Sequence, residues 1–580
     1  MKKKNILLSR LLLMILSMLA AKQSLASANF TISPAPGFHL PTQVQKGSVV
    51  SAFYKVTNQT NSPRIGYSVQ GAPATVTQNN SNSSYCQSPI SLAAHASCIL
   101  QLDISGMAIS NFALCKGSSC TTAAVPLNVG FNNNPLPSIT LEAIPINSQL
   151  PEVRDPIVAQ DDNNWLIVSG TTGNFHQFEI NSFISSIYVY NPSTTELSSM
   201  SSTYLPQEVQ KQLKSSNPEF LEDGETLYII GGFYTADNIN WSTLNTITAI
   251  NIPGMIEAIK TNNTNLASCV NYSTSIPQQF QVTGGQLGKI GSDFYLAFGQ
   301  NCSGDNYCGG PNGQQIYTNS IYQFSMDPTL SSISIINTAT RADNDNSGWR
   351  RRDYTLVPFM RGNTETLLAE GGPFTQPTNP NPGAVWTNGI EFNGNLHANN
   401  SFINQQANQY ATSSLSMYSA SRNEIYAATF SGLSNLYWST TRLVQDLTTP
   451  YGNILDLISY NTNGTVQEYA NMHPMCSGQP VASCLYMGLA AIFIPVSNSN
   501  FFDSRNILQL DQLPNNTKTL VGYIYAGLLS PAQNIFTSTP PPNGPSYTTN
   551  NVYAVYVIPS GTGDVMWNNI TNLYAGIPNS

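Results

Sequence analysis

A stretch from Arg341 to Asp353 carries the side chains of this chain that are best suited to binding chemistry. It holds four of the 23 basic residues and three acidic ones, although only 9% of all residues are charged. Guanidinium forks and an aromatic plane can grip carboxylates or sugars. We therefore predict a ligand-binding group made of Trp349, Arg350, Arg351 and Arg352. The alternative is that these charges pair with one another and hold a loop in place.

Part of this stretch resembles the first half of a calcium-binding loop. Oxygen-bearing side chains alternate at Asp343, Asp345 and Ser347, and Gly348 follows them, which suits a hard cation. The closing acid of such a loop is missing, because Tyr354 stands at its position. We expect no cofactor, with calcium at these three residues as the alternative.

All nine cysteines lie beyond residue 28. Cysteines of exported proteins pair in the oxidising environment outside the cytoplasm. The short separations predict four disulfides, Cys86–Cys98, Cys115–Cys120, Cys302–Cys308 and Cys476–Cys484. Cys269 is left over, and spacing alone leaves the connectivity among the first four cysteines open.

Residues 1–28 have the three parts of a secretory signal peptide. A basic start precedes an apolar core at 11–21 that is too short to span a bilayer, and Ala26-Ser27-Ala28 offers a small-residue cleavage site. We expect an exported protein, in the periplasm, at the cell surface or in the medium, with no transmembrane segment after cleavage. An uncleaved membrane anchor is the alternative.

The charge balance argues against nucleic acid as a partner. The formal net charge is -8 and the sequence pI is about 5.1, whereas phosphate binding requires clustered lysine and arginine. The low charge content also means that neutral polar side chains, chiefly Asn, Ser, Thr and Gln, must keep the chain in solution.

Residues 29–137 are expected to form a first domain of short strands. Runs at 49–56, 98–104 and 125–131 lie between turn-forming tracts, which is typical of a β-sandwich. The segments SAFYKVTNQT (51–60) and SCILQLDISG (97–106) resemble immunoglobulin-like domains of exported bacterial proteins. Asn and Pro residues at 132–137 predict a linker.

Residues 138–580 contain a repeated hairpin pattern, and its clearest copy runs from Asp223 to Gly254. A turn at 223–224 leads into an apolar run that stops at Gly231-Gly232, and a second β-rich run, 246–252, ends at Pro253-Gly254. This order predicts successive antiparallel strands. It resembles the kelch motif, the four-stranded blade of a β-propeller, as in exported kelch-repeat proteins of Gram-negative bacteria.

Six copies of the first hairpin can be counted, at 157–170, 219–232, 280–299, 354–372, 414–430 and 507–527. Each is followed by a second hairpin, most clearly at 186–197. Four-stranded units of this kind cannot bury both faces alone, so we expect them to close into a kelch-like β-propeller. Six blades are favoured, and a seventh from 471–505 is the alternative. The expected fold is all-β, a β-sandwich followed by this propeller.

The expected strand order puts the long loops between second and third strands on one face, together with the Arg341–Asp353 stretch. Long loops on a rigid scaffold usually carry binding sites. This predicts a secreted or surface-exposed binding protein for a protein or glycan partner. The alternative is a carbohydrate-active or galactose-oxidase-like propeller enzyme. Copper is disfavoured because no Tyr-His pair occurs, and no catalytic residue is singled out.

Overall fold

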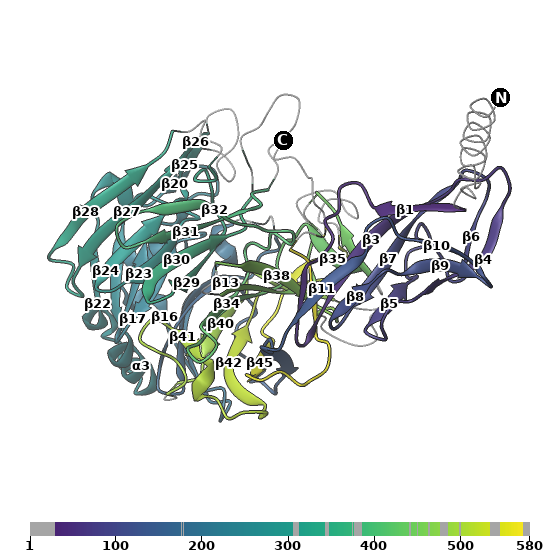
Figure 1. Cartoon of the computed structure of the whole chain (residues 1–580). Helices are drawn as coiled ribbons and strands as arrows, with labels where there is room; N and C mark the ends of the chain where they lie inside the picture. The colour runs from purple at the N-terminus through teal and green to yellow at the C-terminus, as the bar shows by residue number, and fades with distance from the viewer. Residues whose placement is uncertain are drawn as a thin grey trace, which may run out of the picture. The chain divides into compact units, whose positions relative to one another are not determined.

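The computed structural model describes residues 29–573, apart from 176, 178, 305–312, 343–346, 374, 376–384, 440–441, 449, 462–463, 476–484, 498–499, 534–545 and 572. Strands make up 52% of the chain, and the α-helices of the described part are α2 (Gln207–Leu213) and α3 (Ile252–Lys260). The predicted all-β class is confirmed (Figure 1). The expected signal peptide lies outside the described residues.

The chain divides into two compact units between Asn133 and Asn134. The smaller unit contains three groups of paired strands. One is β1 (Phe30–Pro34), β3 (Ser48–Asn58), β7 (Ser97–Ile104) and β5 (Val76–Asn79); the second is β10 (Ser119–Thr122), β9 (Ala113–Lys116), β4 (Arg64–Gln70) and β6 (Ile90–Leu92); the third is β2 (Gln43–Gln45), β11 (Leu127–Asn132) and β8 (Ala108–Ser110).

One apolar core holds these strands together. Alternate residues of β3, such as Ala52, Tyr54 and Val56, are fully buried and pack with Leu114 and Val129 of the other strand groups. This alternation follows from the two-residue period of a strand.

Two disulfides fasten the smaller unit. They join Cys86 to Cys98 and Cys115 to Cys120, as predicted, and the second pair lies opposite one another in the β9–β10 hairpin. Disulfides of this kind indicate an oxidising, exported environment.

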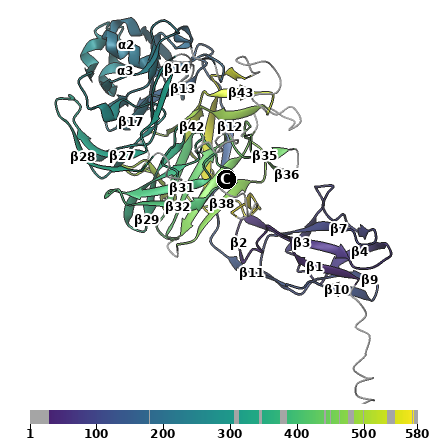
Figure 2. The same ribbon diagram turned by 90° about the horizontal axis from the view of Figure 1, so that it is seen from above.

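The larger unit contains six four-stranded antiparallel groups, which we call sheets 1 to 6. Sheet 1 is β13 (Arg154–Asp161), β14 (Asn164–Thr171), β15 (Ser186–Tyr190) and β16 (Leu197–Ser201); sheet 2 is β17 (Glu219–Asp223), β18 (Thr226–Ile230), β21 (Ile247–Asn251) and β22 (Val270–Ser273); sheet 3 is β23 (Gln286–Ile290), β24 (Asp293–Ala297), β27 (Ser320–Met326) and β28 (Ile333–Thr340). Sheet 4 is β29 (Thr355–Arg361), β30 (Thr364–Glu370), β31 (Asn388–Asn393) and β32 (Ala398–Asn404); sheet 5 is β33 (Ser414–Ser419), β34 (Glu424–Phe430), β37 (Leu455–Asn461) and β38 (Val466–Asn471); sheet 6 is β40 (Ile492–Pro495), β42 (Thr519–Tyr525), β45 (Val552–Ile558) and β12 (Ser138–Ala143). Figure 2 shows several of these strands in a second view.

Five of the six predicted hairpins are confirmed, and the sixth is wrong. The strand that pairs with β42 is β40, not the predicted segment 507–513. Instead, β41 (Ile507–Gln509) runs parallel to β33 of sheet 5. The strand β40, which lies in the 471–505 segment, therefore belongs to sheet 6 and not to a separate seventh four-stranded group. The outer strand of sheet 6, β12, comes from the opposite end of the unit in sequence.

The six sheets pack through six apolar clusters, and the second strand of each sheet shows how. Leu227 and Ile229 of β18 pack toward sheet 1, whereas Tyr228 and Ile230 pack toward sheet 3. The same alternation recurs along the unit, with clusters joining sheets 3 and 4, 4 and 5, 5 and 6, and 6 and 1. Burial of both faces explains why these strands are apolar without interruption.

The long connections between second and third strands are themselves structured. The connections of sheets 2 and 3 combine into one four-stranded sheet, β19 (Phe233–Thr235), β20 (Trp241–Thr243), β25 (Gln300–Gly304) and β26 (Gln314–Tyr317). The connection of sheet 5 carries the hairpin β35 (Leu436–Ser439) and β36 (Arg442–Gln445), and the connection of sheet 6 carries the pair β43 (Leu528–Ser530) and β44 (Tyr547–Thr548).

Pro253-Gly254 is not the end of a strand, as expected, but part of the first turn of α3. The side chain of Asn251 caps this helix by accepting a hydrogen bond from Gly254 N at 2.7 Å, and proline is favoured near a helix start because it needs no N–H partner. The connection between the third and fourth strands is therefore long in sheet 2. The helix covers sheet 1 with Met255 and Ile259.

Candidate functional site

In each of the six sheets, one residue at or shortly before the start of the first strand has a positive φ. These residues are Asp155 (49°), Asn217 (49°), Gly284 (69°), Asp353 (51°), Ala411 (50°) and Ala490 (58°). Non-glycine residues rarely adopt this left-handed conformation, and it persists only where surrounding contacts enforce it. We call these six the mouth residues.

Backbone hydrogen bonds supply the enforcing contacts. Five bonds run from the N–H of one mouth residue to the carbonyl of the mouth residue in the preceding sheet: Gly284 to Asn217 (2.9 Å), Asp353 to Gly284 (2.8 Å), Ala411 to Asp353 (3.0 Å), Ala490 to Ala411 (2.8 Å) and Asp155 to Ala490 (2.9 Å). All six sheets are linked in this way.

A cavity of about 340 Å³ lies against the mouth residues and the strands that follow them. Every one of the six sheets contributes to its wall. Aliphatic and aromatic side chains, including Ile157, Phe220, Leu287 and Phe493, form its apolar part, and the mouth residues Asp155, Asn217 and Asp353 contribute polar side chains. This combination of apolar walls with few polar groups is typical of ligand sites.

Two Arg-Asp pairs occupy equivalent positions in sheets 1 and 4. Arg154 donates to Asp155 with an Nη1–Oδ2 distance of 2.6 Å, and Arg352 forms the corresponding ion pair with Asp353. Asn217 Nδ2 donates to Asp353 Oδ1 at 2.7 Å. These hydrogen bonds fix both carboxylates at the cavity, and the arginines compensate their charge.

Gly284 allows the contact between Asn217 and Asp353. A Cβ atom at Gly284 would come within 2.8 Å of Asp353 Oδ1, and the φ of 69° already disfavours other residues. The Gly284-Gly285 pair, expected to mark a turn, therefore gives the carboxylate room.

Burial perturbs the acids near this cavity. It raises the pKa of Asp155, an effect that the charge of Arg154 opposes and that of Asp353 reinforces. The side chain of Asp155 is partly exposed, whereas that of Glu219 is buried, and burial raises the pKa of Glu219 to about 8. Its Oε1 accepts a hydrogen bond from Gly285 N at 2.8 Å, which favours the ionised form but does not offset the loss of hydration.

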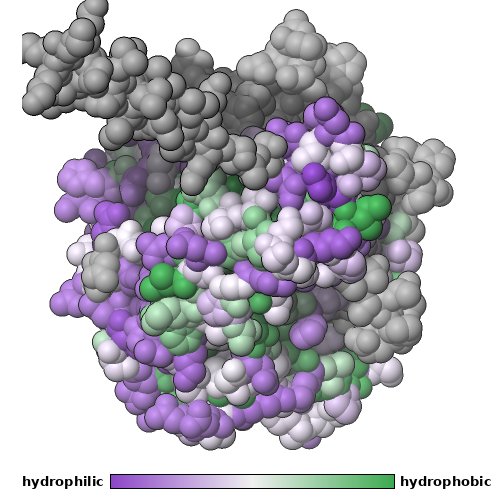
Figure 3. Space-filling view, turned by 45° about the vertical axis from the view of Figure 1, so that its right-hand side comes forward, coloured by the Kyte–Doolittle hydropathy of each residue, from purple (hydrophilic) through white to green (hydrophobic). Residues whose placement is uncertain are grey.

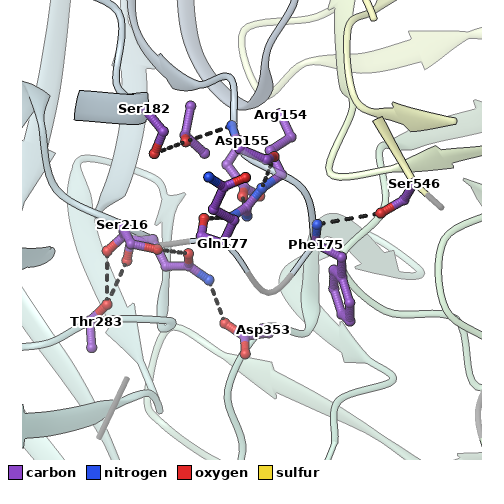
Figure 4. Close-up of polar contacts among 12 residues, drawn as sticks. Arg154, Asp155, Phe175, Gln177, Ser182, Ser216, Thr283, Asp353 and Ser546 are labelled. Atoms are coloured by element: carbon purple, nitrogen blue, oxygen red, sulfur yellow. Dashed lines mark hydrogen bonds and ion pairs between the residues drawn. The ribbon is translucent and has the colours of Figure 1, made fainter. Parts of the chain in front are cut away.

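The connection after β14 brings Phe175 over to sheets 5 and 6. Phe175 packs against the cluster that contains Tyr410, Tyr451 and Leu489, with ring centroids 6.1 Å apart in the Phe175–Tyr451 pair. Arg154 holds the connection by donating to the carbonyls of Gly173 (3.0 Å) and Gln177 (3.1 Å). Figure 4 shows Gln177 beside Arg154 and Asp155, and the hydrogen bond from Phe175 N to Ser546 Oγ.

The predicted ligand-binding group is divided in the structure. Trp349 and Arg351 are buried, and Arg351 donates to the carbonyls of Gly348, Ala369 and Asn388. Burial lowers the pKa of Arg351 to about 9. These two side chains therefore stabilise the interior around sheet 4, Trp349 by apolar packing and Arg351 by hydrogen bonds.

Arg350 and Arg352 lie instead around one aromatic ring. The guanidinium of Arg350 is 4.0 Å from the ring centroid of Tyr317, and Arg352 Nε donates to the Tyr317 hydroxyl at 3.3 Å. Both arginines are partly exposed. Of the predicted group, they are the members placed to meet a ligand.

The remaining predicted residues fall partly outside the described chain. Asp343 and Asp345 lie outside it, as do Cys308, Cys476 and Cys484. Ser347 is described, and its carbonyl accepts a hydrogen bond from Asn388 Nδ2 at 2.8 Å. Cys302 is buried. Cys269 is a free cysteine, as expected.

Asp155, Asn217 and Glu219 were not singled out from the sequence. A usable signal was present, because Arg-Asp occurs at 154–155 and again at 352–353, each close to the start of the first strand of a repeat. Glu219 is an acid at the start of an apolar strand, which is a weaker signal.

In the described part of the chain, no three His, Cys, Asp or Glu side chains are grouped as a metal ion would require. Among the same residues, no helix has the length and apolar character needed to cross a membrane.

No family model matches the chain, and no curated protein sequence matches it. Among solved structures, the chain is similar to one described as "Structure of YjhT". The alignment covers 74% of this chain and 99% of that chain, with 10% identity and a TM-score of 0.33. A similarity of this size carries no information about function.

Proposed function

We propose that the larger unit is a six-bladed, kelch-like β-propeller and that the smaller unit is an immunoglobulin-like β-sandwich. Three features support the propeller: the six equivalent four-stranded sheets, the apolar cluster between sheet 6 and sheet 1, and the hydrogen bonds through all six mouth residues. In a ring, each blade buries both faces against its neighbours. β12, which precedes sheet 1 in the sequence, would close the ring because it completes sheet 6, the last blade.

We further propose that the chain is an exported binding protein that recognises a glycan at the mouth of the central cavity. The observation that carries this proposal is the pair of arginine-compensated carboxylates with Asn217 beside an apolar wall. Each carboxylate oxygen can accept more than one hydrogen bond. Because Arg154 and Arg352 already balance the charge, a neutral ligand rich in hydroxyl groups fits better than a cation.

The size and lining of the cavity agree with such a ligand. About 340 Å³ is within the range of small-molecule sites. Phe220 and Phe493 line it, and such rings pack against the C–H face of a sugar ring while the mouth residues meet its hydroxyls. Arg350 and Tyr317, on the side of the long loops, would contact further sugar units or a carrier protein.

A glycan array followed by calorimetry tests this proposal. Asn217→Ala is expected to weaken binding at least about tenfold. It removes a side-chain amide that can bond to the ligand, and it removes the hydrogen bond that holds the Asp353 carboxylate in place. Asn262→Ala is the matched control, since Asn262 is exposed and also has a positive φ, of 56°. Both variants carry the same backbone strain. Equal affinity of the two variants, or no glycan retained by the wild type, would refute the proposal.

One observation favours a second candidate, a carbohydrate-active enzyme. Asp155 has a raised pKa and shares the cavity with Asp353, and a perturbed acid beside a second carboxylate is a common arrangement for acid-base catalysis. Release of a product from a bound glycan, lost in Asp155→Asn, would support this candidate. Binding without any product would support recognition alone.

A further inference from the structure

The larger unit contains a second cavity that shares no lining residue with the first. Its volume is about 560 Å³. It is lined by residues of β12, β38, β45, β39 (Tyr486–Leu489) and the segment that leads into β46 (Trp567–Asn569). It therefore lies among the strands of sheets 5 and 6, and no mouth residue is part of its lining.

The lining of this cavity is unusually rich in methionine. Met472, Met475, Met487 and Met566 all face it, four of the chain's 13 methionines. Ile139, Leu141, Ile144, Ile146, Leu455, Val552 and Trp567 complete the apolar wall. Methionine is flexible and polarizable, so it adapts to apolar ligands of different shape and makes favourable contacts with aromatic rings.

No Asp, Glu, Lys or Arg residue lines this cavity, and His473 lies at its exposed side. A phosphate, carboxylate or ammonium group would lose its hydration there without a counter-ion. The polar atoms are few: Asn471 is committed to Leu455 N (3.1 Å) and to the His473 carbonyl, whereas Asn551 and Tyr553 form an adjacent pair at 3.2 Å. With no Asp, Glu, Lys or Arg in the lining, a neutral ligand fits this cavity better than a charged one.

The cavity opens to solvent, because Ala143 and His473 in its lining are exposed. A ligand that covers the apolar wall removes it from water, which is favourable roughly in proportion to the apolar area covered. A cavity of about 560 Å³ is large enough for a ligand with an extended ring or chain.

We propose that this cavity binds a neutral, mostly apolar small molecule, with an aromatic or acyl body among the methionines and one hydrogen-bonding group at Asn551 and Tyr553. This site is independent of the glycan site, because the two cavities have no residue in common. The protein would then carry two ligands of opposite polarity.

The neutral fluorophore N-phenyl-1-naphthylamine, titrated into the full mature chain, tests the proposal. Saturable binding at one site is expected, with a dissociation constant in the micromolar range. Ala143→Phe should weaken it at least tenfold, because Ala143 lines the cavity and is exposed, so the larger ring fills space without disturbing a packed core. Ala236→Phe is the matched control at an exposed alanine outside the cavity, and it should bind as the wild type does.

Two further variants guard against misfolding and against confusion with the first site. Met566→Gln makes a partly exposed part of the wall polar and should also weaken binding, whereas Asn217→Ala should leave it unchanged. Non-saturable fluorescence, or equal affinity of Ala143→Phe and Ala236→Phe, would overturn the proposal. Loss of binding in Asn217→Ala would overturn it as well, since the fluorophore would then occupy the other cavity.

Discussion

Replacing Glu219 by glutamine should remove much of the pH dependence of stability in the larger unit. Burial raises the pKa of Glu219 to about 8 from its ordinary value of 4.5. Below pH 4.5 the side chain is protonated in both the folded and the unfolded state, so it adds no pH dependence. Between pH 4.5 and 8 the unfolded chain loses the proton while the folded chain keeps it, and the free energy of unfolding therefore falls as pH rises.

The magnitude follows from the same two pKa values. One unit of pKa difference corresponds to about 1.4 kcal/mol, so Glu219 should destabilise the folded state by about 3 kcal/mol at pH 7 relative to pH 4.5. Glutamine has the same shape, cannot ionise and can still accept the hydrogen bond from Gly285. Any pH-independent cost of the amide cancels when two pH values are compared.

Urea denaturation at pH 4.5 and pH 7 measures this effect. The loss of unfolding free energy between the two pH values should be smaller in Glu219→Gln than in the wild type by about 3 kcal/mol. Glu257→Gln, on an exposed position of α3, is the matched control and should follow the wild type. If Glu219→Gln also follows the wild type, Glu219 is ionised in the folded protein and the argument from burial fails.

Three further changes test the packing described above. Gly284→Ala should destabilise the larger unit by about 1–3 kcal/mol in thermal unfolding, because the φ is positive and the Cβ meets the carboxylate of Asp353; an unchanged midpoint would contradict this. Arg351→Met should cost about 2–4 kcal/mol, since three buried carbonyls lose their donor, whereas the exposed Arg341→Met should cost under about 1 kcal/mol. Cys86→Ala with Cys98→Ala should lower the stability of the smaller unit by about 2–4 kcal/mol in urea, and no change would mean that the disulfide does not constrain the unfolded chain.

The composition of the surface explains how the protein is hydrated although few of its residues are charged. In Figure 3, hydrophobic residues form separate patches among hydrophilic and intermediate residues on the face in view. Charged residues make up only 9% of the chain. Neutral polar side chains therefore supply most of the hydration, and the few charges that are buried, such as Arg351, serve the interior.

The local strand pattern was predictable because it depends on neighbouring residues. An apolar run that ends in a turn such as Asp161–Asn164 specifies a hairpin by itself, and β13–β14 forms as expected. The partner of β42 was not predictable in this way. β40 ends at Pro495 and β42 begins at Thr519, and nothing in the intervening residues distinguishes β40 from the nearer β41 as the partner.

The candidate site likewise depends on contacts that the sequence did not predict. Trp349 and Arg351 were chosen for their chemistry, yet the structure buries both. Arg351 N donates to the Trp349 carbonyl at 2.9 Å in a tight turn, and Arg350 between them stays partly exposed. Asp155 and Asp353 are about 200 residues apart in sequence and become neighbours across one cavity only when sheets 1 and 4 are both in place.

The sequence by itself determined most of the β-strands, the repeated hairpins and the low charge of the chain, and it favoured the two disulfides of the smaller unit over the other pairings without settling them. These features depend on residue type, on the two-residue period and on short separations along the chain. Only the tertiary structure decided that β12 completes sheet 6, that six left-handed residues are joined by backbone hydrogen bonds, and that two Arg-Asp pairs face one cavity. Each of these contacts joins residues from different repeats. Such contacts are fixed by the packing of whole sheets, which no local pattern of residues encodes.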